Sequence, residues 1–375
     1  MSDSRLLVEA AERWGTPLYV TDLDVAAANA RAWRDALPGA LVAFAVKANP
    51  DPALLRRLGD EGFGFEVVGP IELALALRAG APPERIVVNG VGQTDADLAA
   101  ALASGALVNA ESLGGLRALL GAGPGRIGLR VNPALDAGTH PHLATGAAAS
   151  KFGVALDELP EALEMLGGRS LASIGAHIGS DIRDAGPFTL VAELLARLAA
   201  GSRAERVDLG GGFVGSPAAH AAAIRAHLPD TARLIVEPGR SVVAEAGWLL
   251  TRVVRIQARG HLVADAGMTE LIRPMLYGAR HPVTLLAPGA GVAERRWTLS
   301  GPICEAGDVL AEDVELGTEA GEGALLAIGQ AGAYGLAMAS GYNGRLRPAQ
   351  AVIESGVVHL SRRRETLEEI VARDA

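Results

Sequence analysis

The sequence predicts an α/β protein that consists of a (β/α)8 TIM-type barrel and a C-terminal β domain, either a β-barrel or a sandwich. Three observations lead to this prediction. From about residue 41 to residue 237, short apolar runs rich in β-formers alternate with Ala/Leu-rich stretches of helical spacing. After about residue 250, the helical spacing gives way to short β-type runs punctuated by Gly and Pro. The length of 375 residues suits a large barrel plus a smaller domain.

Eight apolar runs in the first part are strand candidates. They are Leu41–Val46, Phe63–Val68, Arg85–Asn89, Ala106–Ala110, Arg126–Val131, Ser173–Ile178, Arg206–Leu209 and Arg233–Val236. The helical stretches between them include Pro52–Leu58, Ile71–Arg78, Asp95–Leu102, Leu113–Leu120, Asp157–Leu166 and Phe188–Ala200. Strands that alternate with helices imply right-handed parallel βαβ units. Eight such units close into a barrel, whose active site lies at the C-terminal ends of its strands. A doubly wound open sheet is the alternative.

The second part reads as a separate β domain. Its strand candidates are Thr251–Ala258, His261–Ala264, Val283–Leu286, Ala324–Ile328 and Ala351–Ile353. The N-terminal run Thr16–Val20 is also strand-like, and we expect it to join this domain. The predicted barrel therefore covers residues 24–250, and the predicted β domain covers residues 1–23 and 251–375.

Composition excludes several classes of protein. The net charge of -9 argues against a general nucleic-acid binder, which needs a basic face. The only cysteine is Cys304, so no intrachain disulfide is possible and a reducing compartment fits. The N-terminus lacks the apolar region of a signal peptide, and no apolar stretch is long enough to span a bilayer. We therefore expect a cytoplasmic protein that binds neither nucleic acid nor a membrane.

Lys47 is the most informative residue, because it closes the apolar run that ends Phe44-Ala45-Val46. An unpaired buried ammonium is costly, so a lysine at this position needs an explanation. Enzymes use such desolvated lysines as amine nucleophiles, typically toward pyridoxal 5'-phosphate or carbonyl substrates. The alternative is a lysine at a strand end that extends to water.

Three further strand ends carry unusual residues, and in a barrel all of them would converge on one mouth. His177 ends the sixth run, Gly210-Gly211-Gly212 follows the seventh, and Glu237 ends the eighth. If the cofactor is pyridoxal phosphate, each has a role. The glycines let backbone N–H groups approach a phosphate, Glu237 keeps the pyridine nitrogen protonated, and His177 stacks on the ring. A plain turn, a turn carboxylate paired with Arg240 and a structural histidine are the alternatives.

Taken together, the motifs resemble a known family. They are Phe44–Asn49, Ser150–Gly153, His177–Ser180, Asp208–Gly212, Glu237–Arg240, Leu271–Tyr277, Gly301–Asp308 and Gly332–Gly335. In this order they are similar to the fold-type III, alanine-racemase-like pyridoxal-phosphate decarboxylases, and most closely to the diaminopimelate decarboxylases. The similarity extends from about Thr16 to Ser355.

The resemblance implies a role for each matching residue. Lys47 matches the lysine that binds the cofactor covalently, and His177 matches the histidine stacked on its ring. Catalytic roles are implied for Lys47, His177 and Cys304. Cys304 matches the proton donor, and Lys47 is the alternative donor. Cofactor contacts are implied for Lys47, His177, Ser180, Gly211, Gly212, Glu237, Gly239, Arg240 and Tyr334. Substrate contacts are implied for Arg240, Arg273, Tyr277, Glu305 and Tyr334. No metal ion is expected.

The implied reaction is decarboxylation of an amino acid through an external aldimine and a quinonoid intermediate. Two arginines, Arg240 and Arg273, suit carboxylate recognition and favour a substrate with a second carboxylate, meso-diaminopimelate, which would give L-lysine. A salt bridge within the β domain is the alternative for Arg273. The family also implies a homodimer, in which Cys304 and Glu305 reach the partner's active site. Alternative functions are a specialised paralogue acting on another or a carrier-bound amino acid, an amino-acid racemase, and a non-enzymatic pyridoxal-phosphate-binding protein.

Overall fold

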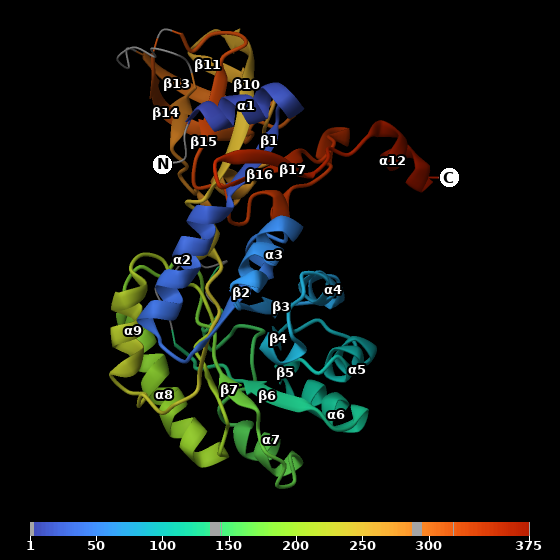
Figure 1. Cartoon of the computed structure of the whole chain (residues 1–375), viewed down its shortest axis with the longest axis vertical. Coiled ribbons are helices and arrows are strands. Elements are labelled where there is room, and N and C mark those ends of the chain that lie inside the picture. Colours follow the sequence, from blue (N-terminus) through green and yellow to red (C-terminus); the bar gives the residue numbers. More distant parts are fainter. Residues whose placement is uncertain (1–3, 136–142, 144, 287–294, 318, 375) are drawn as a thin grey trace. The chain divides into compact units, whose positions relative to one another are not determined.

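The computed structural model describes residues 4–135, 143, 145–286, 295–317 and 319–374 (Figure 1). The chain divides into two compact units, Ala27–Val242 and Met1–Ala26 with Val243–Ala375. Strand β10 (Gly247–Gln257) begins inside the range 24–250 that the sequence assigns to the barrel. Its first residues pair with β1 (Leu18–Asp22) of the second unit. The boundary between the two units is therefore defined more sharply by strand pairing than by the change of residue spacing in the sequence.

Eight parallel strands of the first unit form a closed barrel in chain order. They are β2 (Leu41–Ala45), β3 (Gly64–Val67), β4 (Ile86–Val88), β5 (Leu107–Ala110), β6 (Arg126–Arg130), β7 (Ser173–Gly175), β8 (Val207–Asp208) and β9 (Leu234–Val236). The barrel closes because β2 pairs with β9, with Leu41 opposite Ile235. The predicted TIM-type barrel is confirmed, and the open doubly wound sheet is excluded.

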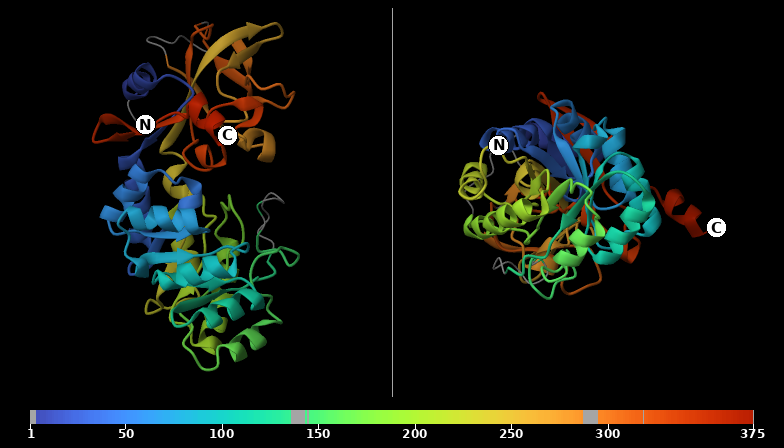
Figure 2. Two further views of the ribbon diagram at one scale, coloured as in Figure 1. Left: turned by 90° about the vertical axis from the view of Figure 1, so that its right-hand side faces the viewer. Right: turned by 90° about the horizontal axis from the view of Figure 1, so that it is seen from below.

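Helices surround the barrel strands, as the right-hand view of Figure 2 shows. They are α2 (Leu23–Ala36), α3 (Pro52–Asp60), α4 (Pro70–Arg78), α5 (Asp95–Ala103), α6 (Leu113–Ala122), α7 (Leu159–Met165), α8 (Gly186–Ser202), α9 (Pro217–Arg225) and α10 (Arg240–Val243). The six helical stretches predicted from the sequence fall on α3 to α8. Local signals start several of these helices. Asp51, for example, accepts hydrogen bonds from the backbone N–H groups of Ala53 and Leu54 and so caps α3.

The interior of the barrel changes from apolar to polar along the strands. One buried apolar cluster joins Leu41, Val87, Leu107 and Ile235. Because β4 and β9 are not neighbours in the sheet, a cluster that contains both Val87 and Ile235 lies inside the barrel. Toward the C-terminal ends of the strands, the buried residues are instead polar, among them Glu66, Asn89, Asn109, Arg130 and Asp208. Burying polar groups is costly unless they are hydrogen-bonded, so this end is built for something other than stability.

The second unit contains a mixed sheet with the strand order β14-β13-β11-β10-β1-β16-β17, to which β15 and β12 add beside β10. Its remaining strands are β11 (His261–Ala264), β12 (Val283–Leu285), β13 (Arg295–Ser300), β14 (Val309–Leu316), β15 (Leu325–Ile328), β16 (Ala349–Glu354) and β17 (Val357–Arg362). Its helices are α1 (Ser4–Trp14), α11 (Arg273–Tyr277) and α12 (Leu367–Val371). Strand β1 runs antiparallel to β10 and parallel to β16, so the N-terminal strand joins the β domain as predicted.

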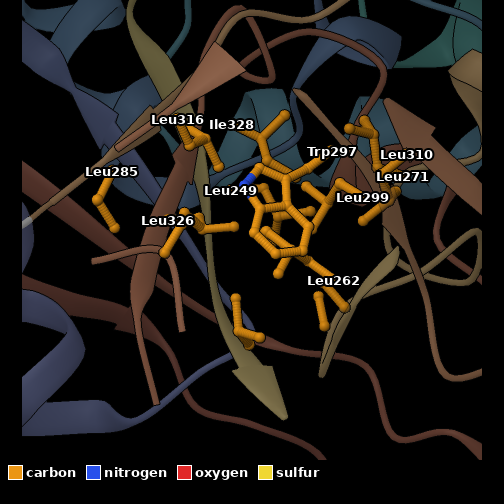
Figure 3. Packing of buried hydrophobic residues seen from close by; sticks show 14 of the residues in the cluster. Leu249, Leu262, Leu271, Leu285, Trp297, Leu299, Leu310, Leu316, Leu326 and Ile328 are labelled. Atoms are coloured by element: carbon orange, nitrogen blue, oxygen red, sulfur yellow. The ribbon is translucent and has the colours of Figure 1, made fainter. Parts of the chain in front are cut away.

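Leucines from several strands pack around Trp297 in the core of the second unit (Figure 3). Strands β13, β14 and β17 were not predicted from the sequence. Charged residues interrupt the apolar pattern of β13 and β14, and a histidine, a serine and an arginine interrupt that of β17. Among the described residues of both units, no helix is long and apolar enough to cross a membrane.

Candidate active site

Lys47 lies at the C-terminal end of β2, in the single 3-10 turn Val46–Ala48 that follows the strand. Its ammonium is paired with the carboxylate of Glu66, which lies near the C-terminal end of β3 and is almost completely buried. The Lys47 side chain itself keeps 32% of its surface exposed. The amine is thus held at the mouth of the barrel by a fixed anion, and it can still be reached by a ligand.

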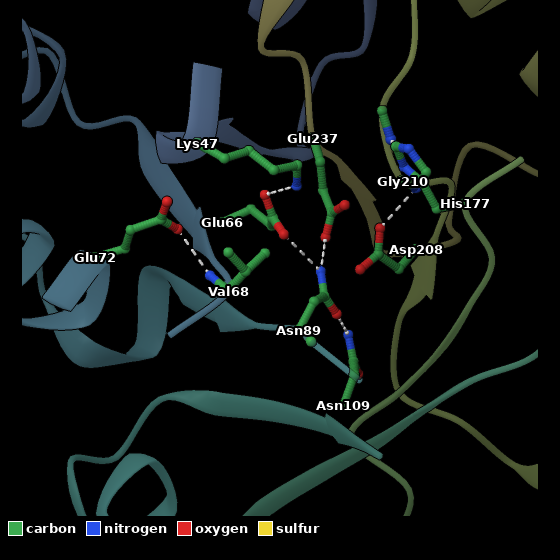
Figure 4. A network of polar contacts seen from close by, with 12 residues as sticks. Lys47, Glu66, Val68, Glu72, Asn89, Asn109, His177, Asp208, Gly210 and Glu237 are labelled. Atoms are coloured by element: carbon green, nitrogen blue, oxygen red, sulfur yellow. Dashed lines mark hydrogen bonds and ion pairs between the residues drawn. The ribbon is translucent and has the colours of Figure 1, made fainter. Parts of the chain in front are cut away.

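A chain of hydrogen bonds crosses the inside of the barrel from Glu66 (Figure 4). The amide nitrogen of Asn89 donates to Glu66 Oε1 at 3.2 Å and to Glu237 Oε1 at 2.8 Å. Asn109 donates to the Asn89 amide oxygen at 2.9 Å, and the Ser173 hydroxyl donates to Asn109 Oδ1 at 2.6 Å. Residues in or directly after β3, β4, β5, β7 and β9 are therefore linked, and the Lys47 and Glu237 side chains are parts of one connected network.

Gly128 makes room for this network. A Cβ atom at Gly128 would lie 2.0 Å from Asn109 Oδ1 and 2.1 Å from Ser173 Oγ. Both distances are well inside van der Waals contact, so any side chain at this position would displace the Asn109–Ser173 hydrogen bond. The polar network therefore requires a glycine at position 128 because there is no space for a side chain, and not because of the backbone conformation of β6.

Glu237 follows β9 and is 3% exposed. Burial raises the pKa of Glu237 well above its ordinary value, and the nearby carboxylates of Asp208 and Glu66 raise it further. Burial likewise raises the pKa of Asp208 to about 6. Lys47 opposes the shift of Glu237 but does not cancel it. Three carboxyl groups thus converge where burial and mutual repulsion disfavour their ionised forms, and a cationic group placed beside Glu237 would favour its ionised carboxylate.

The raised pKa of Asp208 predicts a pH-dependent stability. Above the ordinary value of 3.8, the unfolded chain loses the proton that the folded state keeps up to about pH 6. Stability is therefore favoured at low pH and is lost as the pH rises through this window. The asparagine side chain of Asp208→Asn does not ionise, so this variant avoids the loss of stability at high pH. In the cofactor-free protein, we therefore expect its melting temperature to exceed that of the wild type by a few degrees at pH 8.

Thermal melts of both proteins from pH 4 to pH 8 would check this expectation. The gain of the variant should grow between about pH 4 and pH 6 and then stay constant. A difference between the two melting temperatures that is the same at every pH would contradict it.

His177 stands beside the glycine loop that follows β8. The backbone N–H of Gly211 donates to His177 Nδ1 at 2.9 Å. Burial lowers the pKa of His177 well below its ordinary value, and the positive charges of Arg130 and Lys47 lower it further. The ring is therefore neutral at physiological pH, and its edge is fixed by Gly211. A neutral, fixed ring is better suited to stacking on a flat ligand than to forming an ion pair.

The glycine loop approaches its neighbours too closely for any other residue. A Cβ atom at Gly211 would lie 2.3 Å from the Glu237 carbonyl oxygen, and one at Gly212 would lie 2.1 Å from the Gly179 carbonyl oxygen. Gly212 also has a φ of +94°, in the left-handed region. Such a loop, bare of side chains, leaves its backbone N–H groups open to an anion.

Ser180, Gly239 and Arg240 complete the predicted set in the barrel. Arg240 Nη2 donates to the Ser180 hydroxyl at 3.4 Å, which joins the loops after β7 and β9. At Gly239, a Cβ atom would come within 3.0 Å of the Cβ atoms of Ala45 and Ala48, next to Lys47. A cavity of about 450 Å³ opens at this end of the barrel, and its lining includes Lys47, Glu66, Asn89, Arg130, His177 and Glu237.

Five residues of this site were not predicted from the sequence. They are Glu66, Asn89, Asn109, Glu111 and Arg130. Arg130 Nη1 lies 3.1 Å from Glu111 Oε1, and its guanidinium lies over the Phe152 ring with Cζ 4.9 Å from the ring centroid. A pattern in the sequence could have identified these five residues. Each is a polar residue within or next to an otherwise apolar strand run, at an inward position near the C-terminal end.

Five predicted residues belong to the second unit. Arg273 begins α11 and is buried, and its Cζ lies 5.5 Å from the ring centroid of Tyr277. Cys304 and Glu305 are exposed neighbours in the loop between β13 and β14. Tyr334 has a φ of +57°, an uncommon backbone conformation for a tyrosine.

Residues 23–244 match the family model described as "Pyridoxal-dependent decarboxylase, pyridoxal binding domain". This range contains the whole barrel and every barrel residue discussed above. The chain belongs to the pyridoxal-dependent decarboxylase family.

Relatives of this decarboxylase match over the full length. The diaminopimelate decarboxylase of Deinococcus radiodurans is 43% identical over 388 residues, which cover 100% of both chains. That of Aquifex aeolicus is 40% identical and covers 97% of this chain and 93% of its own. A crystal structure of diaminopimelate decarboxylase from Helicobacter pylori complexed with L-lysine superimposes with a TM-score of 0.92 at 31% identity, covering 98% of this chain and 99% of that one.

The site residues of this decarboxylase fit pyridoxal phosphate, the cofactor of the family. The cofactor presents an aldehyde, a pyridine nitrogen and a phosphate. The barrel offers a reachable amine on Lys47, a buried carboxyl group on Glu237 that a cationic partner would ionise, and a loop at Gly211 and Gly212 that excludes side chains. The donor set thus matches all three functional groups of the cofactor.

Proposed function

We propose that this enzyme decarboxylates meso-diaminopimelate to L-lysine. The observation that carries the proposal is the 43% identity over the entire length of a relative named diaminopimelate decarboxylase. The matched length includes the barrel, which carries Arg240, and the β unit, which carries the other predicted substrate residues. A racemase and a non-enzymatic binding protein have no comparable support.

Within this proposal, the barrel residues hold the cofactor. Lys47 would bind the aldehyde carbon, Glu237 would keep the ring nitrogen protonated and His177 would provide a flat surface for the ring. Ser180, Gly211, Gly212, Gly239 and Arg240 would contact the cofactor on its phosphate side, and so would Tyr334 of the second unit. When bound, pyridoxal phosphate supplies a covalent link to the substrate amine and a ring that accepts an electron pair.

The remaining residues act on the substrate. Decarboxylation breaks the bond between Cα and one carboxylate and releases carbon dioxide, after which one proton must be delivered to Cα. The thiol of Cys304 donates that proton. Arg273, with Tyr277 and Arg240, binds the carboxylate that is kept, because a guanidinium forms paired hydrogen bonds to a carboxylate. Glu305 binds the distal ammonium, and Tyr334 contacts the substrate as well as the phosphate.

The test is a substrate comparison with the cofactor-loaded enzyme. Carbon dioxide and lysine are followed with meso-diaminopimelate, and L-ornithine, L-lysine, L-arginine and L-glutamate serve as parallel substrates. Lysine formation from diaminopimelate alone is the expected result. Gas release from a different amino acid would reject the substrate, and loss of optical rotation without gas would point to racemisation.

Arg273→Lys tests the carboxylate contact. Lysine keeps the positive charge but cannot form the paired hydrogen bonds of a guanidinium. We expect the KM for diaminopimelate to rise by roughly tenfold or more, with a smaller effect on kcat. The matched control is Arg296→Lys, since Arg296 is an exposed arginine paired with Glu315 on the surface of the same unit. An unchanged KM in Arg273→Lys would reject this role.

We further propose that the two units act as a cofactor-binding barrel of residues 24–250 and a β domain of residues 1–23 and 251–375, which supplies substrate and dimer contacts. The enzyme forms a homodimer with shared active sites and acts in the cytoplasm in lysine biosynthesis. Sedimentation of the cofactor-loaded enzyme at micromolar concentration tests the oligomeric state, and a monomer would reject it.

A further inference from the structure

The loop Gly301–Asp308, between β13 and β14, carries Cys304 and Glu305 and is here named the Cys304 loop. It closes on itself through its backbone. Gly301 N–H donates to the Asp308 carbonyl at 2.9 Å, and Asp308 N–H donates to the Glu305 carbonyl at 3.0 Å. Within it, Glu305 N–H donates to the Ile303 carbonyl at 2.7 Å. The loop is therefore compact, although the side chains of Cys304 and Glu305 are exposed.

Asp308 fixes the base of the Cys304 loop. Its carboxylate is buried and accepts hydrogen bonds from Ile303 N–H at 2.7 Å and from Met268 N–H at 2.6 Å. Gly267 and Gly301 pack so closely here that a Cβ atom at Gly301 would lie 2.4 Å from Gly267 Cα. These contacts hold the ends of the loop, but none of them involves the backbone of Cys304 or the carboxylate of Glu305.

A second segment, residues 341–345, forms hydrogen bonds with both the backbone of Cys304 and the carboxylate of Glu305. The side-chain oxygen of Asn343 accepts a hydrogen bond from Cys304 N–H at 3.1 Å. The hydroxyl of Tyr342 donates to Glu305 Oε2 at 3.4 Å. Both partners lie nearly forty residues away in the sequence, so adjacent residues of one segment contact adjacent residues of the other.

The 341–345 segment is itself held in place. Arg345 Nη2 donates to the carbonyl of Asp265, and its Nε lies 3.9 Å from the buried carboxylate of Glu270. Just before the segment, Ser340 N–H donates to the Thr269 carbonyl at 2.9 Å. Asn343 has φ +56° and ψ +24°, a left-handed conformation that asparagine and glycine tolerate better than other residues. The side chain of Asn343 thus reaches Cys304 from a rigid support.

We propose that Asn343 and Tyr342 are positioning residues for the decarboxylation, Asn343 acting through Cys304 and Tyr342 through Glu305. This inference rests on the proposed function, which assigns proton donation to Cys304 and substrate binding to Glu305. Asn343 anchors the backbone of Cys304 and thereby sets where the thiol sits. Tyr342 holds the Glu305 carboxylate in the orientation that receives the distal ammonium of the substrate. Small errors in such placement cost rate, because proton transfer needs a narrow range of geometry.

Two substitutions at Asn343 separate the hydrogen bond from the backbone. Asn343→Gly keeps the left-handed conformation but removes the acceptor, and Asn343→Asp keeps both. We expect Asn343→Gly to lower kcat on the order of tenfold while the visible absorbance of the bound cofactor is unchanged. Asn343→Asp should retain a kcat close to that of the wild type.

A second readout does not depend on turnover. Cys304 is the only cysteine, so alkylation by iodoacetamide reports on this thiol alone. The alkylation rate should differ from that of the wild type in Asn343→Gly and return to it in Asn343→Asp. Equal kcat and alkylation rates in Asn343→Gly and wild type would overturn the proposal, and so would an Asn343→Asp variant as impaired as Asn343→Gly. Failure of the proposed function is seen separately, as absence of diaminopimelate turnover by the wild type.

The Tyr342 contact is tested by a double-mutant cycle with Glu305. Tyr342→Phe removes only the hydroxyl, and we expect the KM for diaminopimelate to rise several-fold with a smaller change in kcat. If Tyr342 acts through Glu305, the same substitution made in a Glu305→Ala background, which has no side-chain acceptor for the hydroxyl, should have little further effect. An equal effect of Tyr342→Phe in both backgrounds would overturn this half of the proposal.

Discussion

Lys47→Ala is expected to abolish the visible absorbance of the cofactor-loaded enzyme and to reduce kcat by roughly a thousandfold or more. The amine of Lys47 is the group that the structure places at the mouth of the barrel, held by Glu66. Alanine cannot bind the aldehyde of the cofactor, so neither the spectrum nor the covalent exchange with substrate can be retained. Absorbance spectra and single-turnover assays measure both effects.

The chain offers a matched control, since Lys47 and Lys151 are its only two lysines. Lys151 is exposed and lies outside the barrel cavity, with its amine 5.4 Å from the ring centroid of Phe152. Lys151→Ala should therefore keep the absorbance band. Borohydride reduction followed by peptide mass analysis should place the cofactor on the peptide that contains Lys47. Recovery of the label on Lys151, or a retained band in Lys47→Ala, would refute the assignment.

Glu237→Gln is expected to lower kcat by about two to three orders of magnitude with the cofactor still bound. Burial and the neighbouring carboxyl groups raise the pKa of Glu237, and a protonated ring nitrogen beside it would stabilise the ionised carboxylate. Glutamine keeps the shape and a hydrogen bond to Asn89 but has no charge to stabilise that proton. The ring then withdraws electrons poorly when the carboxylate of the substrate departs.

The measurement for Glu237→Gln is kcat alongside the cofactor spectrum. Glu237→Asp serves as the charge-preserving control and should retain more activity than the glutamine variant. A glutamine variant with the kcat of the wild type would show that Glu237 does not act at the ring nitrogen. A variant that no longer binds the cofactor would assign Glu237 to binding instead of catalysis.

The barrel could be predicted from the sequence because its strands and helices are marked locally. The apolar run from Leu41 to Val46, for example, became β2, and the strand ends with Lys47, His177 and Glu237 meet at one mouth as parallel topology requires. The strands β13, β14 and β17 could not be found in this way. Charged or polar residues are mixed with their apolar ones, so the alternating apolar signal on which strand prediction depends is weak.

What the sequence by itself determined is the order of the elements and the residue types at the strand ends, because both follow from periodicity along the chain. Only the tertiary structure decided the contacts among them. That Asn89 bridges Glu66 and Glu237, or that Asn343 reaches the backbone of Cys304, depends on the register of strands and on turns far apart in the chain. A hydrogen bond forms only within a few tenths of an ångström of its preferred length, and no local pattern specifies a distance between distant segments.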